Sequence, residues 1–321
     1  MKPDGNKVCC VFDIPGWAWH RKASALQKHL NDDFRKFTIV KNKSFHKGLF
    51  AKYNLLHMFG WMDRRKLAGK YKGLTAGVSS HNFIALHPEK AKHYMPKYSA
   101  LTAVSKLIYH ELLARKLNKN IYYCPNGVDT DQFRPGKKTQ NTDKLVIGWL
   151  GQPSGSGFSR SEGWDAHGYH NLLLPLMDSL KDKKDIHFEI LARTHKNAKP
   201  WDAMFGWYHN IDIMLHVGVL TGTPNSIFEA AASGKAGIST AIGESPQLIK
   251  TTYNGHLVPR VCSKEDAKRC VEDIRALILK LNQSDVEEMG KNARKEVEEK
   301  WTWEQRAKAY IEVFNRHRKK I

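Results

Sequence analysis

Short apolar runs alternate with amphipathic helical patterns along this chain, and the alternation restricts its fold more than any other feature. Lys7–Phe12 (KVCCVF), Phe37–Val40 and Leu101–Ser105 are typical of buried strands, whereas Trp17–Leu30 and Lys106–Leu117 are typical of helices. Strands that alternate with helices indicate an α/β protein whose parallel sheet is covered by helices on both faces.

The alternation occurs twice. Arg134–Lys144 (RPGKKTQNTDK) has no apolar periodicity and is predicted to be a linker. We therefore expect two doubly wound Rossmann-like domains, 1–141 and 142–301, that face a central cleft where ligands bind beyond the carboxyl ends of the strands. Trp303, Tyr310, Ile311 and Phe314 form an apolar stripe on a helix over 302–321. This helix is expected to join the N-terminal domain.

The positive charge of the chain is concentrated in its first part. Residues 1–140 contain 26 basic and nine acidic residues, a net charge of +17, whereas the remainder carries +3. Solubility alone could explain a basic protein, but the asymmetry favours contact with a polyanion such as nucleic acid, an anionic membrane or an acidic glycan. Basic and aromatic residues are interleaved at two candidate contact regions, namely Trp17, Trp19 and Arg21, and Arg64, Arg65 and Lys66.

Several classes of protein are disfavoured. No apolar run approaches the ~20 residues of a spanning helix, and the first residues do not fit a signal peptide. The five cysteines contain no C-x-x-C pair, which indicates free thiols in a reducing cytoplasm rather than a zinc cluster or a disulfide framework. Neither G-x-x-x-x-G-K-[ST] nor a G-x-G-x-x-G after the first strand occurs.

The segment 217–239 (VGVLTGTPNSIFEAAASGKAGIS) contains a candidate anion site. A strand ends in a turn of hydroxyl and glycine residues, and a helix then begins near Asn225. Backbone amides at a helix N-terminus favour an anion such as a diphosphate. Glu229, about one turn into the helix, could accept hydrogen bonds from the hydroxyls of a ribose, or could simply favour its own helix N-terminus.

Residues 221–249 (TGTPNSIFEAAASGKAGISTAIGESPQLI) resemble the donor-site motif of retaining GT-B glycosyltransferases, in particular glycosyltransferase family 4. Three further blocks are similar to the family: Leu101–Pro135 with its Pro-Asn-Gly-Val-Asp, IGWLGQ after the linker, and Asn254–Val258. The resemblance extends from Asp13 to Arg260 and implies the GT-B fold.

The resemblance also implies roles for individual residues. Glu229 would bind the ribose of a nucleotide-sugar, and the diphosphate would lie at Thr223, Asn225 and Ser226. Thr221 and Gly222 are further donor-binding candidates. The catalytic candidates are Gly16, which would let backbone approach the donor, and His81, which would contact the transferred sugar. Thr221 replaces the first Glu of the family pattern, and Gln152 and His167 stand where the family has its diphosphate-binding Arg and Lys. Arg160, Arg193 or Lys196 would then balance the charge of the leaving group.

The implied activity is metal-independent transfer with retention from a nucleotide-sugar, with UDP-sugar as the expected co-substrate and no cofactor. The basic first domain would hold a polyanionic acceptor, and a hydroxymethylated pyrimidine in DNA, as some viruses carry, is the specific expectation. The alternative acceptor is a lipid or cell-envelope glycan at an anionic membrane surface. Because Thr221 replaces the first Glu of the family pattern, a further alternative is an inactive module that binds a nucleotide-sugar or nucleic acid. No protein partner is indicated, and the expected location is the cytoplasm, or the host cytoplasm for a viral protein.

Overall fold

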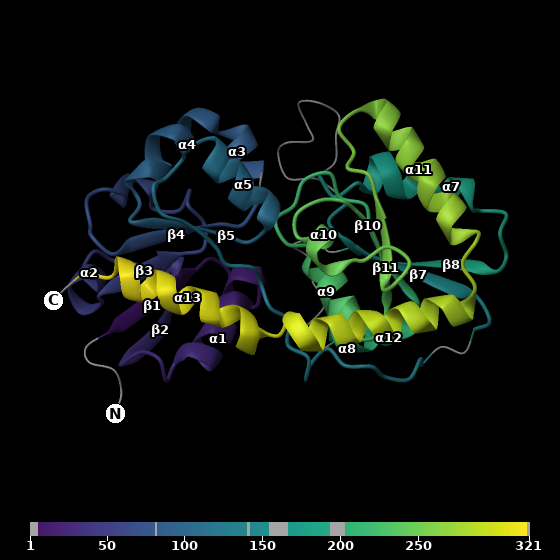
Figure 1. The fold of residues 1–321 in the computed structure, drawn as a ribbon, viewed down its shortest axis with the longest axis horizontal. Helices are drawn as coiled ribbons and strands as arrows, with labels where there is room; N and C mark the ends of the chain where they lie inside the picture. The colour runs from purple at the N-terminus through teal and green to yellow at the C-terminus, as the bar shows by residue number, and fades with distance from the viewer. Residues whose placement is uncertain (1–5, 81, 140–141, 154–165, 193–202, 320–321) are drawn as a thin grey trace. The chain divides into compact units, whose positions relative to one another are not determined.

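The computed structural model describes residues 6–80, 82–139, 142–153, 166–192 and 203–319. The chain divides into two compact units, shown in Figure 1. Unit 1 consists of Met1–Gly127 and Trp303–Ile321, and unit 2 consists of Val128–Thr302.

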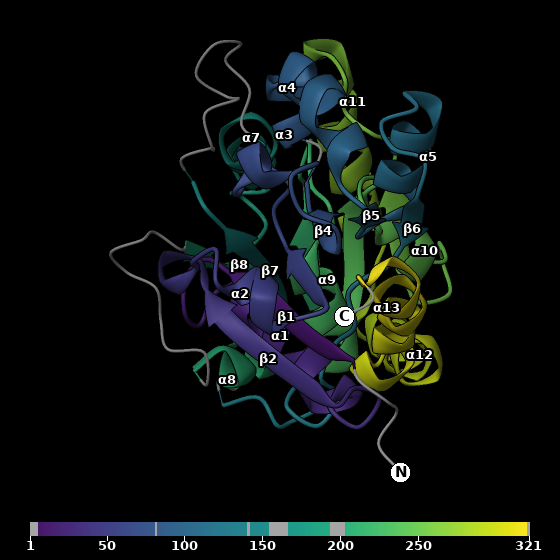
Figure 2. The ribbon, with the colours of Figure 1, turned by 90° about the vertical axis from the view of Figure 1, so that its left-hand side faces the viewer.

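Unit 1 is built on a parallel six-stranded sheet of order β2-β1-β3-β4-β5-β6. Figure 2 shows β2 beside β1 at one edge of this sheet. Its strands are β1 Lys7–Phe12, β2 Lys36–Lys41, β3 Leu55–Met58, β4 Leu74–Val78, β5 Ala100–Ala103 and β6 Ile121–Tyr123. Its α-helices are α1 Ala18–Leu30, α2 Leu49–Lys52, α3 Asn82–Leu86, α4 Pro88–Tyr94, α5 Lys106–Ala114 and α13 Trp303–His317. Short 3₁₀ turns lie at η1 Asn42–Ser44, η2 Arg65–Leu67 and η3 Met95–Lys97.

Strand β1 is buried on both faces, which explains its uninterrupted apolar sequence. Cys9 and Val11 belong to a core cluster with residues of α2, α4 and α5, whereas Val8, Cys10 and Phe12 belong to a cluster with α1 and α13. Helix α13 packs along α1 (Figure 1) through Ala307, Tyr310, Val313 and Phe314. This is the packing that its apolar stripe predicts.

Unit 2 is built on a parallel five-stranded sheet of order β11-β10-β9-β7-β8. Its strands are β7 Leu145–Gly151, β8 Ile186–Ala192, β9 Ile213–His216, β10 Ala236–Thr240 and β11 Gly255–Val258. Its helices are the π-helical turn η4 Tyr169–Leu173, α7 Leu174–Ser179, α8 Ala203–Asn210, α9 Asn225–Ala232, α10 Ser245–Leu248, α11 Lys264–Ile278 and α12 Gln283–Lys300. Ser263 caps the N-terminus of α11, because its hydroxyl accepts the amide of Asp266 at 3.1 Å.

The expected boundary at residue 141 lies inside unit 2, because the segment after Gly127 is tied to that unit. The Val128 amide donates to the Trp301 carbonyl, Lys138 pairs with Asp212 at 2.7 Å, and Thr139 bonds to the Asn210 side chain. Part of the segment predicted as a linker is therefore an ordered edge of unit 2.

Two properties hold for the part of the chain that the structure describes. None of these helices has the length and apolar character needed to cross a membrane. No three His, Cys, Asp or Glu side chains among these residues cluster in a way that would hold a metal ion.

Candidate functional site

In unit 2, the carboxyl ends of β7, β9 and β10 lie at one edge of the sheet, and the loop 217–224 leaves β9 there on its way to α9. This loop is held from both sides. The Val219 amide donates to the Ala166 carbonyl at 2.9 Å, and the Thr240 hydroxyl donates to the Gly218 carbonyl at 2.6 Å. The loop is therefore fixed before any ligand binds.

Two glycines make this fixation possible. Gly168 has a φ of +70°, and a side chain on it would collide with the Val217 carbonyl. Gly243 has a φ of +55°, and a side chain there would collide with the Gly222 carbonyl and approach Thr221. Both positions combine a left-handed backbone with close contact, which only glycine accommodates without strain.

The residues predicted to bind the donor follow one another into α9. Thr221, Thr223 and Asn225 are half-buried, whereas Gly222 and Ser226 are buried. The helix begins at Asn225 after Pro224, as the sequence predicts, and the Asn225 amide is already donated to the Thr223 carbonyl at 2.9 Å.

Glu229 lies one turn into α9 and is only 7% exposed. Its Oε2 accepts the hydroxyl of Tyr208, from α8, at 2.7 Å. Tyr208 is itself fully buried, so it fixes the orientation of the carboxylate. No sequence motif predicts this contact, because Tyr208 precedes Glu229 by 21 residues and lies in another helix.

A second group that sequence reasoning missed is His216, the last residue of β9. It is 8% exposed, and its Nε2 has no hydrogen-bond partner among the described residues. This nitrogen lies against Gly218, where an added Cβ would come within 2.9 Å. Burial, together with the nearby His167, lowers the pKa of His216 to about 3. The ring is therefore neutral at physiological pH, beneath the loop that leads to α9. The position of His216 at the end of a central strand was the sequence feature that could have identified it.

In unit 1, the first predicted site lies where β1 ends. Gly16 has a φ of +78° with open space around its Cα, and its amide donates to His20 Nδ1 at 2.9 Å. Trp17 caps α1 and is half-buried, as is Arg21. Trp19 fills the space above Gly60 and packs against the core, so its role in the structure is packing.

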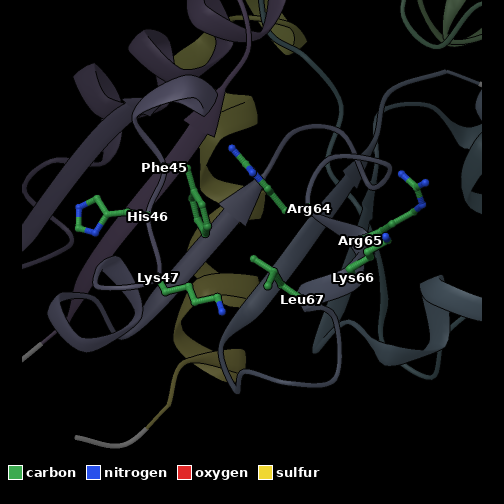
Figure 3. Close-up of a pocket in the computed structure, with 7 residues that line it drawn as sticks. All are labelled: Phe45, His46, Lys47, Arg64, Arg65, Lys66 and Leu67. Atoms are coloured by element: carbon green, nitrogen blue, oxygen red, sulfur yellow. The ribbon is translucent and has the colours of Figure 1, made fainter.

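The second predicted site of unit 1 follows β3. Arg64, Arg65 and Lys66 line a pocket of about 390 Å³ together with Phe45, His46, Lys47 and Leu67 (Figure 3). The 45–47 segment comes from the loop after β2 and was not among the residues predicted from the sequence. Because β1 pairs in parallel with both β2 and β3, these loops and the Gly16 turn share one edge of the sheet.

The aromatics of this second region are not exposed. Phe59 and Trp61 precede Arg64 in the sequence, and their proximity to the basic residues and to the end of a strand predicts a site aromatic at Trp61. Each is only 1% exposed, so that prediction is wrong. The Trp61 side chain belongs to the core of unit 1. Of the remaining candidates, His81, Arg160, Arg193 and Lys196 lie outside the described residues.

Comparisons with known proteins agree with this arrangement. Residues 174–312 match the family model described as glycosyl transferase-like. No curated protein matches the sequence at a significant level.

Solved structures are similar to nearly the whole chain. Sucrose-phosphate synthase from Thermosynechococcus elongatus superposes with a TM-score of 0.69 at 12% identity, over 97% of this chain and 99% of that chain. Anabaena HepE in complex with UDP and glucose gives 0.61 at 12% identity, over 97% and 100%. S. aureus TarM gives 0.60 at 14% identity, over 81% of this chain and 55% of the larger TarM chain.

The predicted fold class is confirmed by these similarities over nearly the full length. The two parallel sheets and the similarity to solved structures over nearly the full length lead to one assignment: the chain has the GT-B fold, and its residues 174–312 match the glycosyl transferase-like family model.

Proposed function

We propose that this protein is a retaining, metal-independent glycosyltransferase that transfers a sugar from a UDP-sugar to a hydroxyl on a polyanionic acceptor. Unit 2 would bind the donor and unit 1 the acceptor. The observation that carries the proposal is the buried Glu229, oriented by Tyr208 one turn into a helix at the carboxyl edge of the sheet. The structure of HepE with UDP and glucose supports a UDP-sugar as donor.

In the proposed reaction, the acceptor oxygen bonds to the anomeric carbon while the bond from that carbon to the diphosphate oxygen breaks. The hydroxyl proton passes to the leaving phosphate oxygen. Attack from the face that the diphosphate leaves retains the configuration. Amides at the start of α9 would stabilise the charge that develops on the leaving group.

For the acceptor, we propose a hydroxymethylated pyrimidine in DNA. The support is the excess of 17 positive charges in residues 1–140 and the basic pocket beside the Gly16 turn. The second candidate is a lipid or cell-envelope glycan. One observation favours it, since the TarM structure contains UDP and alpha-GlcNAc-glycerol.

The test is a transfer assay with UDP- and GDP-sugars. Each donor is incubated with duplex DNA containing hydroxymethylcytosine, with the same duplex unmodified, and with vesicles that carry a lipid acceptor. Mass spectrometry of the acceptor should show addition of a sugar only to the hydroxymethylated duplex. Transfer to the lipid alone would establish the second candidate, and the absence of transfer and of donor hydrolysis would refute the enzyme.

Glu229→Gln tests the donor site. Loss of the carboxylate should raise the UDP-sugar KM or abolish turnover. The matched control is Glu296→Gln, because Glu296 is equally buried, at 5% exposed, but pairs with Lys250 and Lys300. The control should lower stability and leave the KM unchanged. Equal KM values for wild type and Glu229→Gln would refute the assigned role.

A further inference from the structure

The pocket of unit 1 has a composition that suits an anion. Five of its seven lining residues are Lys, Arg or His, and none is acidic. The nearby Asp63 does not line it, and its carboxylate accepts the Asn42 side chain at 3.3 Å. Burial and Asp13 raise the pKa of Asp63, against the influence of Arg64. The lining therefore presents positive charge without a competing carboxylate.

Arg64 is fixed in place. Its Nε donates to Asn42 Oδ1 at 3.1 Å and its Nη2 to the Asn42 carbonyl at 3.0 Å. The guanidinium also lies over the Phe45 ring, 5.3 Å from the centroid. The backbone of Arg64 is left-handed, with a φ of 54°. A non-glycine residue in this conformation needs support from its surroundings, and these contacts with the loop after β2 provide it.

The two lysines are different. The ammonium groups of Lys47 and Lys66 have neither a hydrogen bond nor an ion pair within the described part of the chain. In Figure 3, Phe45, Lys47, Arg64 and Leu67 surround the hollow, whereas His46 points away from it. The pocket thus combines a fixed guanidinium with ammonium groups that are available to a ligand.

The shape and the surroundings of the pocket indicate which anion it takes. A volume of about 390 Å³ lies within the range of small-molecule sites, ~300–1,000 Å³, and exceeds what a bare phosphate needs. Docking to a bilayer requires apolar side chains that project from the protein. The exposed large hydrophobic residues described in unit 1 are Ile14 and Leu113, and neither belongs to the pocket loops.

We propose that this pocket binds one sugar–phosphate unit of the nucleic-acid acceptor strand, with the phosphate held by Lys47 and Arg64 and the sugar against Phe45 and Leu67. Lys66, which lines the pocket beyond Leu67 (Figure 3), adds positive charge at its rim. The inference rests on the proposed function for the identity of the acceptor. Such a contact fixes the register of the strand without reading its sequence. A single phosphate bound here increases the magnitude of the negative slope of log K against log salt by about 0.9.

The experiment compares two double variants that each remove two positive charges. Lys47→Ala with Lys66→Ala changes the pocket, whereas Lys90→Ala with Lys92→Ala changes exposed lysines of α4 outside it. Binding of a fluorescein-labelled duplex is measured by anisotropy across a series of NaCl concentrations. The pocket variant should reduce the slope by about 0.9, and the α4 variant should leave it unchanged.

Asn42→Ala serves as a variant of unchanged charge. It removes the hydrogen bond from Arg64 Nε to the Asn42 side chain and leaves only the bond to the Asn42 backbone carbonyl. Arg64 is then held less firmly, so duplex binding should weaken while thermal unfolding confirms that the protein is folded. Equal slopes for both double variants would overturn the proposal. Binding to phosphatidylglycerol–phosphatidylcholine vesicles that depends on Lys47 and Lys66, with weak duplex binding, would also overturn it. UDP-sugar hydrolysis separates the two proposals: its absence in wild type refutes the enzyme, whereas the slope change alone decides the pocket.

Discussion

Lys22 offers the sharpest test of the energetics of unit 1. Its side chain, in α1, is 4% exposed, and no carboxylate pairs with it among the described residues. Its Nζ lies 5.7 Å from the Phe59 ring centroid and 5.3 Å from that of Tyr310. Burial lowers the pKa of Lys22 from 10.5 to about 7, although Cys124 and Cys10 act in the opposite direction.

The protonation of Lys22 in the folded and the unfolded protein determines how the free energy of unfolding depends on pH. Between pH 7 and 10.5 the unfolded chain holds a proton on Lys22 that the folded protein has released, so the free energy of unfolding rises with pH across this window. Below pH 7 Lys22 is protonated in both states, and its burial then lowers the free energy of unfolding by about 5 kcal/mol, at 1.36 kcal/mol per pKa unit. Two aromatic rings around the ammonium offset roughly 2 kcal/mol of this.

Lys22→Met keeps the unbranched side chain and removes the charge. We expect the variant to exceed wild type in unfolding free energy by about 2–4 kcal/mol at pH 6 and by about 1 kcal/mol or less at pH 10. Urea denaturation followed by tryptophan fluorescence at both pH values measures the difference. Burial also raises the pKa of Cys9 and of Cys124 to about 12, but these thiols contribute equally to both proteins, so the difference isolates Lys22.

Lys36→Met is the matched control. Lys36 is exposed on β2, and its Nζ lies 5.9 Å from the centroid of the Tyr53 ring. Its replacement should change the unfolding free energy little and equally at both pH values. A Lys22→Met protein that is less stable than wild type at pH 6 would refute the reasoning, because the buried ammonium would then be a net stabilising group.

Three further substitutions test unit 2. His216→Phe removes a buried nitrogen that has no hydrogen-bond partner among the described residues, so the free energy of unfolding should stay unchanged or rise by about 1 kcal/mol. Calorimetry with UDP should show weaker binding by this variant. The control is His256→Phe, at an equally buried histidine of β11, which should leave UDP binding intact. Tyr208→Phe should lower the free energy of unfolding by about 1–3 kcal/mol, because the buried Glu229 loses a hydrogen bond. The same variant should raise the KM for the UDP-sugar. An unchanged KM would show that Tyr208 does not orient the Glu229 carboxylate for the donor. Ser263→Ala should cost about 0.5–2 kcal/mol in thermal denaturation through loss of the α11 cap, and an unchanged melting temperature would contradict that role.

The sheet architecture could be predicted because strands buried on both faces carry an unmistakable pattern. KVCCVF places alternate side chains on opposite faces of the sheet, and both faces are core in the structure. The start of α9 was also predictable, since the turn before Asn225 and the apolar face after it are local signals. Local sequence therefore determined the elements and the order in which they occur.

Contacts between distant segments could not be predicted. The basic pocket needs Phe45–Lys47 and Arg64–Leu67, which only the parallel pairing of β2 and β3 with β1 brings to one edge. Trp61 shows the same limit, because a stretch that mixes aromatic and basic residues does not reveal which side chains turn inward. Lys22 likewise lies on the face of α1 that α13 covers, a contact that spans nearly the whole sequence.

The membership of α13 in unit 1 sets the order in which the protein can be completed during synthesis. The ribosome makes residues 128–302 before it makes Trp303–His317, so unit 2 is fully translated while unit 1 still lacks one layer of its core. Until Tyr310, Val313 and Phe314 emerge, the apolar face formed by Val8, Leu26 and Leu30 remains uncovered. A nascent chain stalled between the two points therefore exposes the surface that chaperones bind, and the N-terminal unit is the last to finish folding.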